Sequence, residues 1–152
     1  MTDFTPQAAD YEARVRDSFG RQGIMGLLGA ALSRVEPGLV EIALAFRPDL
    51  SQQHGFFHAG VTSTIADSAG GYAAFSLFPA SASVLTVEYK VNLIAPADGE
   101  RLTALGRVIK PGRTLTLCEL EVTAHKNGAA KLCAKGLQTI MRIDGRPDVT
   151  EG

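Results

Sequence analysis

The chain of 152 residues is 45% hydrophobic and 20% charged, which suits a hydrophobic core, and we take residues 1–152 as one domain. Its formal net charge of -1 excludes a broad basic surface for nucleic acid or for an anionic membrane. No uninterrupted apolar run approaches the roughly 20 residues of a membrane span, and the polar, acidic N-terminus is unlike a secretory signal. We therefore expect a cytoplasmic protein with no nucleic-acid or membrane partner.

The N-terminal segment, residues 1–19, is expected to be mostly helical. Ala, Glu and Arg dominate residues 7–19, which follow Pro6 and contain few apolar side chains, so this stretch predicts an exposed helix. The next stretch, residues 20–29, is apolar but interrupted by glycine, which indicates a turn or the wall of a pocket rather than a regular element.

A β-hairpin is predicted after these residues. Pro37-Gly38 separates two strand-like stretches, residues 30–36 and 39–46, and this dipeptide is typical of a turn. Residues 47–57 are then expected to form a loop that leads into the central part of the chain.

The central part of the chain is predicted to be a buried helix over residues 58–77. It is rich in small residues and apolar nearly all round, as expected for a helix buried on every side. Gly70-Gly71 costs helix stability, about 1 kcal/mol for each glycine relative to alanine, but bare backbone suits close packing against a sheet. Across residues 50–87 the sole Asp, Glu, Lys or Arg is Asp67.

Strand patterns dominate the rest of the chain, with breaks at Pro96, at Pro111-Gly112 and at the strong hairpin signal Asn127-Gly128. The order of elements predicts an α+β fold, with a mostly antiparallel six-stranded sheet wrapped around one long helix. The predicted strands are residues 84–94, 99–110, 113–125 and 130–143, and residues 144–152 are expected to be a flexible tail.

The two cysteines are expected to be reduced packing residues. With a two-residue turn in the last hairpin, Cys118 falls opposite Leu137 and Cys133 falls opposite Val122. The cysteines are then offset by about 13 Å along the strands, well beyond the roughly 7 Å that a disulfide can span.

Candidate catalytic residues cluster where the chain enters the buried helix. A helix N-terminus presents unpaired backbone N–H groups and a positive dipole end, which suit a carbonyl oxygen or an oxyanion, and Ala59 and Gly60 are small enough for close approach. Asp67 is a carboxylate in apolar surroundings; it is either functional or bonded to a nearby hydroxyl or solvated at a subunit boundary. His58 is either a catalyst or, as is commoner at a helix start, a cap or packing residue.

A family resemblance rests on the motif Gln52-x-x-Gly55-x-x-His58-Ala59-Gly60, with Asp67 nine positions after the histidine. This motif resembles that of the hot-dog-fold acyl-CoA thioesterases of the phenylacetate-degradation (PaaI-like) type, whose signature is Asn-x-x-Gly-x-x-His-Gly-Gly followed by Asp at that spacing. The likeness continues through the Pro and Gly-Arg-Thr-Leu layout of the later strands and covers roughly residues 20–142. It implies a hot-dog fold and hydrolysis of acyl-CoA to CoA and a carboxylic acid.

The resemblance also implies roles for individual residues. Asp67 matches the carboxylate that activates water or attacks the thioester, and Ala59 supplies a backbone N–H to the thioester carbonyl. Gln52 stands where the family has Asn, which helps place substrate or water, and Thr86 stands where some members have a Ser that holds the water. The implied catalytic set is Asp67, Ala59, Gly60, His58, Gln52 and Thr86, and the implied substrate-binding set is Gly55, Phe56, Phe57, Lys110, Gly112, Arg113 and Thr114.

Two parts of the substrate have expected contacts. Lys110 and Arg113 lie in the turn that contacts CoA in such proteins, and two cations suit its phosphates, although cations in a turn are often merely solvated. The acyl group would lie in an apolar slot whose candidate residues also suit an ordinary core: Met25, Leu28, Phe56, Phe57 and Tyr72.

Helix geometry predicts an obligate homodimer. Ala59 and Asp67 are eight residues apart, which is roughly 12 Å along a helix, whereas both groups must act on one carbon within about 3–3.5 Å. We therefore expect Asp67 of one chain to meet the Ala59 amide of another, with two equivalent sites at the interface. The family resemblance implies the same assembly, in some members as a dimer of dimers.

Other functions remain open at this stage. The main alternative is a non-catalytic, acyl-CoA-binding or regulatory hot-dog domain; a hot-dog hydratase is disfavoured because its usual Asp and His motif is not recognisable. We expect no cofactor and no metal, since the spacing of His54, His58 and Asp67 matches no defensible ligand set. The acyl preference, and the choice between Asp67 as base and as nucleophile, are left undecided.

Overall fold

The structure is a computed structural model that describes residues 4–146 and 148. The first three residues of the expected N-terminal segment, and residues 147 and 149–152 of the expected tail, lie outside the described residues. The helices are α1 (Tyr11–Gly20), α2 (Gly23–Leu28), the 3₁₀ turn η1 (Pro48–Leu50) and α3 (Ala59–Phe75), and the strands are β1 (Ala31–Glu36), β2 (Leu39–Ala45), β3 (Ser83–Leu93), β4 (Arg101–Lys110), β5 (Leu115–Lys126) and β6 (Ala129–Ile143).

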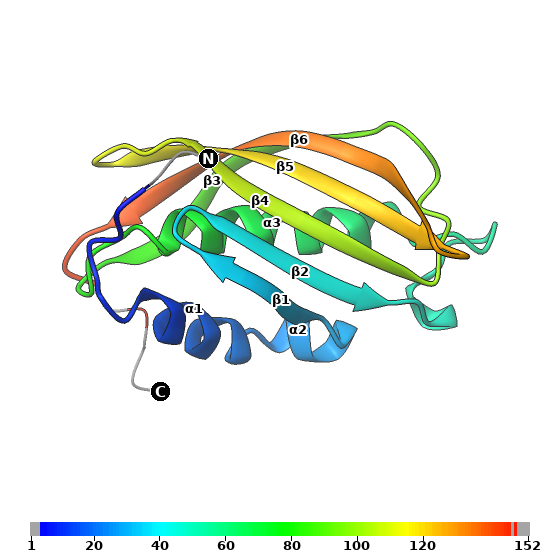
Figure 1. Ribbon diagram of the computed structural model, residues 1–152, viewed down its shortest axis with the longest axis horizontal. Helices are drawn as coiled ribbons and strands as arrows, with labels where there is room; N and C mark the ends of the chain where they lie inside the picture. Colours follow the sequence, from blue (N-terminus) through cyan, green and yellow to red (C-terminus); the bar gives the residue numbers. More distant parts are fainter. Residues whose placement is uncertain (1–3, 147, 149–152) are drawn as a thin grey trace.

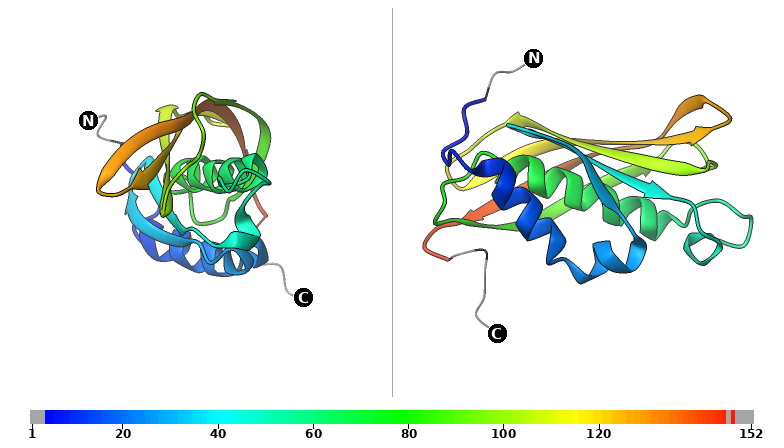
Figure 2. Two further views of the ribbon diagram at one scale, coloured as in Figure 1. Left: turned by 90° about the vertical axis from the view of Figure 1, so that its right-hand side faces the viewer. Right: turned by 60° about the horizontal axis from the view of Figure 1, so that its bottom comes forward.

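The described strands form a six-stranded sheet in the order β1-β2-β4-β5-β6-β3, and all neighbours are antiparallel. The sheet curls around α3, which lies against its concave face (Figures 1 and 2). Asn127 and Gly128 both have positive φ, 51° and 78°, as the tight turn of a two-residue hairpin requires. The predicted α+β fold, with an antiparallel sheet wrapped around one long helix, is confirmed.

The N-terminal region differs from the prediction in two ways. α1 is not simply exposed, because Val15 and Phe19, one helical turn apart, are buried along one of its faces. Residues 20–29 are not merely a turn or pocket wall, because they contain the short helix α2. Burial of Met25 and Leu28 offsets the helix cost of the glycines, and Gly29 ends α2 with a left-handed φ of 74°.

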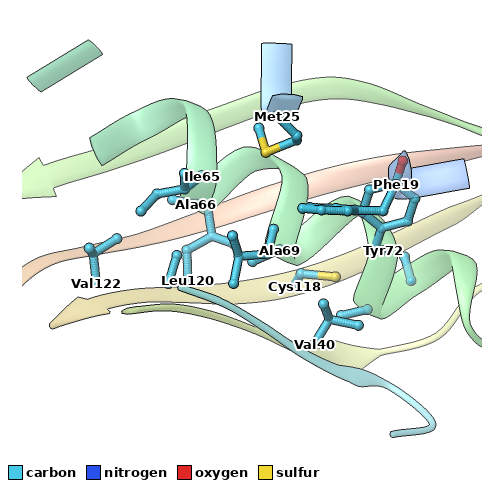
Figure 3. Packing of buried hydrophobic residues seen from close by; sticks show 14 of the residues in the cluster. Phe19, Met25, Val40, Ile65, Ala66, Ala69, Tyr72, Cys118, Leu120 and Val122 are labelled. Carbon is cyan, nitrogen blue, oxygen red and sulfur yellow. The ribbon is translucent and has the colours of Figure 1, made fainter. Parts of the chain in front are cut away.

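The core lies between α3 and the concave face of the sheet and extends to Phe19 of α1 and Met25 of α2 (Figure 3). A Cβ added to Gly70 would lie 2.5 Å from Leu120 Cδ2, and one added to Gly106 on β4 would lie 2.3 Å from the backbone of Ala69. The expectation that bare backbone at position 70 permits close packing on the sheet is thus confirmed, whereas a Cβ on Gly71 would meet nothing within 4 Å.

In the single chain α3 is not buried on every side, contrary to the prediction. Gly60 is exposed, and Thr64, Asp67 and Gly71 are half-buried. These four residues follow one another at spacings of four, three and four, so they form a stripe along one helix face. The helix therefore buries its broad face in the core and leaves a narrow face open beside Asp67.

The pairing of β5 with β6 contains a β-bulge that shifts the predicted register. Thr123 pairs with Leu132 but Val122 pairs with Ala134, so Cys133 is the extra residue. Cys118 consequently lies opposite Gln138, one position beyond the predicted partner. Both cysteines are free and buried, as predicted.

Candidate active site

His58 begins α3 as its N-cap. Its backbone is extended, and its Nδ1 accepts a hydrogen bond of 2.8 Å from the Gly60 N–H. The Gly60 amide is therefore occupied by the cap and is not the open donor at this helix start. Among the described residues the Ala59 N–H has no hydrogen-bond acceptor, so Ala59 presents the open donor of the helix N-terminus.

The loop before α3 is held by its own backbone. The Gly55 N–H donates to the Gln52 carbonyl at 3.0 Å, and the Gln52 N–H donates to the Phe56 carbonyl at 2.9 Å. Gly55 has a left-handed φ of 83°, which favours glycine at that turn. The Gln52 side chain accepts a hydrogen bond from the His54 N–H through Oε1, and this bond ties the glutamine to the start of the loop.

An apolar cavity of about 510 Å³ lies beside the Ala59 amide. It brings together the predicted Gln52, Phe56, Phe57 and Ala59 with residues that the sequence did not single out for the site. The complete lining is Gln52, Phe56, Phe57, Ala59, Thr62, Leu93, Ile94, Ala95, Pro96, Ala97 and Cys133.

Asp67 is fixed by two side chains from the sheet. Thr86 Oγ1 donates a hydrogen bond of 2.7 Å to Asp67 Oδ1, and Gln138 Nε2 donates one of 2.6 Å to the same oxygen. No hydrogen bond to Oδ2 exists within the described residues. One carboxylate oxygen is therefore held while the other stays available for chemistry.

The Asp67 carboxylate lines a second, smaller cavity of about 200 Å³. This cavity shares no lining residue with the first one, so within one chain Asp67 and the Ala59 amide do not belong to a single site. Its lining is Gln22, Asp67, Ser68, Gly71, Tyr72, Val84, Leu85 and Thr86.

In the single chain the residues predicted for the acyl slot do not line one cavity. Phe56 and Phe57 line the first cavity, Tyr72 lines the second, and Met25 and Leu28 line neither. Four of the five, Met25, Leu28, Phe57 and Tyr72, belong to the hydrophobic core.

The turn between β4 and β5 is exposed throughout residues 110–114. Neither Lys110 nor Arg113 has a salt-bridge partner in the described part of the chain. A Cβ on Gly112 would lie 1.9 Å from the Leu115 carbonyl oxygen, so only glycine fits this tight return. Lys110, Gly112, Arg113 and Thr114 thus form an exposed turn with two unpaired cations.

Two other ionisable groups near the cavities are held in their neutral forms. Burial raises the pKa of Tyr72 to about 12, and the hydroxyl lies 3.2 Å from Ser18 Oγ. Burial also raises the pKa of the Cys133 thiol, which donates to the Val122 carbonyl at 3.3 Å. A protonated, hydrogen-bonded thiol is a poor nucleophile, so Asp67 is the better candidate for the reacting group.

The described residues contain no helix long and apolar enough to cross a membrane. They also contain no group of three His, Cys, Asp or Glu side chains placed to hold a metal ion.

Known proteins agree with this architecture. A model of the thioesterase superfamily matches residues 54–131, from the loop before α3 to the start of β6. A thioesterase family protein from Silicibacter pomeroyi is 48% identical, with a TM-score of 0.88 over 89% of this chain and 99% of that chain. A protein from Saccharolobus solfataricus with a provisional esterase name is 29% identical over 127 residues, which are 84% of this chain and 82% of the relative.

A more distant structural relative has the same fold. The PaaI protein of Escherichia coli, from the phenylacetic acid degradation operon, has a TM-score of 0.81 over 93% of this chain and 99% of its own, at 17% identity. At that identity the likeness concerns the fold alone. Because the superfamily match covers just over half of the chain, including α3 and the strands β3, β4 and β5, the chain belongs to the thioesterase superfamily and is a thioester hydrolase with the hot-dog fold.

Proposed function

We propose that this thioesterase hydrolyses acyl-CoA, releasing CoA and a carboxylic acid. The observation that carries the proposal is the state of Asp67, whose Oδ1 is held by Thr86 and Gln138 while Oδ2 accepts no hydrogen bond from the described residues. A carboxylate whose one oxygen is held in place keeps its other oxygen in a fixed orientation towards a reacting atom.

In the proposed mechanism the Ala59 N–H activates the thioester carbonyl and Asp67 activates the attacking water. The Ala59 N–H donates to the thioester oxygen and stabilises the negative charge that develops there. Asp67 Oδ2 takes a proton from water while the water oxygen attacks the acyl carbon; the C–S bond then breaks, and the proton passes to the departing sulfur. In the nucleophilic variant Oδ2 itself attacks, the thiolate leaves, and water hydrolyses the resulting anhydride.

The other residues of the motif support the donor. His58 caps α3 and engages the Gly60 N–H, which leaves the neighbouring Ala59 N–H to face the substrate. Gln52 lines the same cavity, and we assign it to contact with the thioester or the water.

A homodimer would unite the two half-sites. In one chain the Ala59 amide and the Asp67 carboxylate lie in separate cavities, and their separation of roughly 12 Å along the helix forbids joint action. If two copies of α3 pack antiparallel across a two-fold axis near Ser63, midway between positions 59 and 67, each Asp67 faces the partner's helix start. The open stripe on α3 consists of small residues around Asp67, which suits such close helix packing.

The edge strand β3 supports the same assembly. It is bonded on one side only, to β6, and it carries the exposed apolar side chains Leu85, Val87, Tyr89 and Leu93. A long apolar edge strand is a template for pairing with another strand. We assign β3 to a self-complementary contact with β3 of a second copy, which would extend the sheet across the dimer.

The remaining substrate contacts follow from charge and polarity. Lys110 and Arg113 in the exposed β4–β5 turn are assigned to the CoA phosphates. The apolar cavity beside Phe56 and Phe57 is assigned to an uncharged part of the substrate, the acyl group or the pantetheine arm.

The test is an assay of free CoA released from aryl-, short-, medium- and long-chain acyl-CoAs. We expect turnover of at least one class, and we expect Asp67→Asn to lower kcat by about 10²- to 10⁴-fold while CoA binding is retained. Asp10→Asn is the matched control, because Asp10 is exposed and its side chain makes no cap hydrogen bond. Failure of the wild-type protein on every acyl-CoA would refute the substrate class, and full activity of Asp67→Asn would refute the role of the carboxylate.

A further inference from the structure

Gln138 is a buried polar residue that the motif does not include. It lies on β6, is 1% exposed, and is among the largest fully buried side chains of the described residues. Its Oε1 is buried without a hydrogen-bond partner in the described part of the chain. Since burial of an unpaired carbonyl is unfavourable, the rest of this side chain must serve a purpose that outweighs the cost.

The contacts of the Gln138 side-chain nitrogen are with Asp67 and Thr86 of the candidate site. Nε2 lies 2.6 Å from Asp67 Oδ1, 3.1 Å from the Asp67 backbone carbonyl, and 3.1 Å from Thr86 Oγ1. Nε2 therefore links the Asp67 carboxylate, the Asp67 backbone and Thr86, which is the other hydrogen-bond donor to that carboxylate. With two bonds to Asp67 from one NH₂ group, the side chain of Asp67 is fixed relative to its helix.

A register shift in the sheet turns the Gln138 side chain towards α3. In the two-residue hairpin Lys126 pairs with Ala129, and that register would place Leu137 opposite the buried Cys118 and turn Gln138 to the outer face. The bulge at Cys133 shifts the register by one residue, so Gln138 lies opposite Cys118 and points to α3. A second bulge, at Val87, lies beside Thr86, which bonds the same carboxylate.

The helix also makes room for the glutamine. A Cβ at position 70 of α3 would lie 1.9 Å from Gln138 Oε1 and 2.5 Å from Leu120 Cδ2, so the glycine in the middle of the helix makes room for both side chains. Three unfavourable features thus coincide at one point: a bulge in a ladder, a glycine inside a helix and an unpaired amide oxygen. The bulge and the unpaired oxygen follow from bringing an amide N–H to Asp67, and the glycine makes room for that amide beside Leu120.

We propose that Gln138 is the positioning residue of the catalytic carboxylate: it holds Asp67 Oδ1 so that Oδ2 faces the substrate. This inference rests on the proposed function of Asp67. The residue acts through Asp67 and does not touch the substrate, so its removal lowers the rate of the chemical step without weakening substrate binding.

The experiment compares Gln138→Met with Gln138→Glu. Methionine keeps the length and removes the donor, and glutamate keeps the shape but sets a second carboxylate against Asp67. We expect kcat to fall about 10- to 100-fold in the methionine variant, with KM changed less than about twofold, and to fall further in the glutamate variant. The methionine variant should unfold at the same or a higher temperature, because it removes the unpaired Oε1.

The matched control is Gln7→Met, the same chemical change at an exposed glutamine, which should leave kcat, KM and unfolding temperature unchanged. A methionine variant that folds and retains wild-type kcat would overturn the proposal, as would a rise in KM equal to the loss of kcat/KM. If Asp67→Asn also retained full activity, the failure would instead lie in the proposed function.

A second readout does not depend on turnover. The side-chain NH₂ resonances of Gln138, identified by their absence in Gln138→Met, should shift strongly in Asp67→Asn and in Thr86→Val. Resonances that do not respond to either substitution would contradict the hydrogen bonds on which the proposal rests, even if the Gln138 variants fold poorly.

Discussion

Replacing Ala59 by proline is expected to remove the donor of the site and leave the helix intact. Ala59 is the first residue of α3, where proline is well tolerated because that N–H has no acceptor within the helix. His58, with φ of -64° and ψ of 142°, already has the extended backbone that a residue before proline requires. Loss of one such donor lowers kcat by about 10²- to 10³-fold, or about 2.7–4 kcal/mol of transition-state stabilisation.

Mixing Ala59→Pro chains with Asp67→Asn chains then tests whether the site is shared. In a mixed dimer one site joins the two altered residues and is dead, and the other joins an intact Ala59 with an intact Asp67. Random pairing makes about half of the dimers mixed, each with one working site of two, so about a quarter of wild-type activity should return. Neither variant alone should exceed about one per cent, given the losses expected for the donor and the carboxylate.

The assay measures release of CoA after the two purified variants have been unfolded and refolded together. A mixed dimer isolated through two different affinity tags should have about half of the wild-type activity, because one of its two equivalent sites is intact. The reciprocal control pairs a wild-type chain with the double variant: a shared site makes that dimer inactive, and a site within one chain leaves it half active. An active reciprocal dimer, together with no recovery in the first mixture, would refute the shared site.

Three further predictions concern assembly, packing and pH. Ser63→Cys should form a disulfide between subunits on mild oxidation, because the proposed two-fold axis passes near Ser63; a dimeric variant that forms no crosslink would contradict that position of the axis. Gly70→Ala should lower stability by about 1–3 kcal/mol through overpacking against Gln138, measured by urea unfolding, whereas Gly20→Ala, whose Cβ would meet nothing within 4 Å, should not lower it. Burial raises the pKa of Cys118 from 9.0 to about 12, so above about pH 9 the unfolded chain loses this proton before the folded chain does. The free energy of unfolding should therefore fall by up to about 1.4 kcal/mol per pH unit in that range. Cys118→Ala should reduce this slope, and an unchanged slope would show that other groups cause it.

The sequence allowed the central helix and its carboxylate to be predicted because both depend on local composition. The long stretch without charges marks the buried helix, and Asp67 stands out as its exception. Turn residues placed most strands within a residue or two, since Asn127-Gly128 adopts the positive φ values that a tight hairpin needs. The short helix α2 was missed because its glycines argue against a helix, and only tertiary burial of its apolar residues outweighs them.

The partners of Asp67 were only half predictable. Thr86 lies 19 residues away along the chain and was found through a family motif, whereas Gln138 lies 71 residues away and belongs to no motif. Regular pairing counted from the hairpin turn would turn Gln138 to the outer face of the sheet, because such pairing has no room for an extra residue. The bulge at Cys133 reverses this assignment, and in a strand with a side-chain period of two a single inserted residue exchanges the inner and outer faces of every position beyond it.

The bulge links the register of the sheet to the chemistry of the site. If the ladder between β5 and β6 were regular, Leu137 would turn towards α3 and the carboxylate would lose one of its two donors. The missing Cβ at position 70 would then make room for Leu120 alone and no longer for the glutamine amide. The bulge and Gln138 should therefore change together or not at all: without the bulge the glutamine faces away from Asp67, and without the glutamine the bulge brings no donor to the carboxylate.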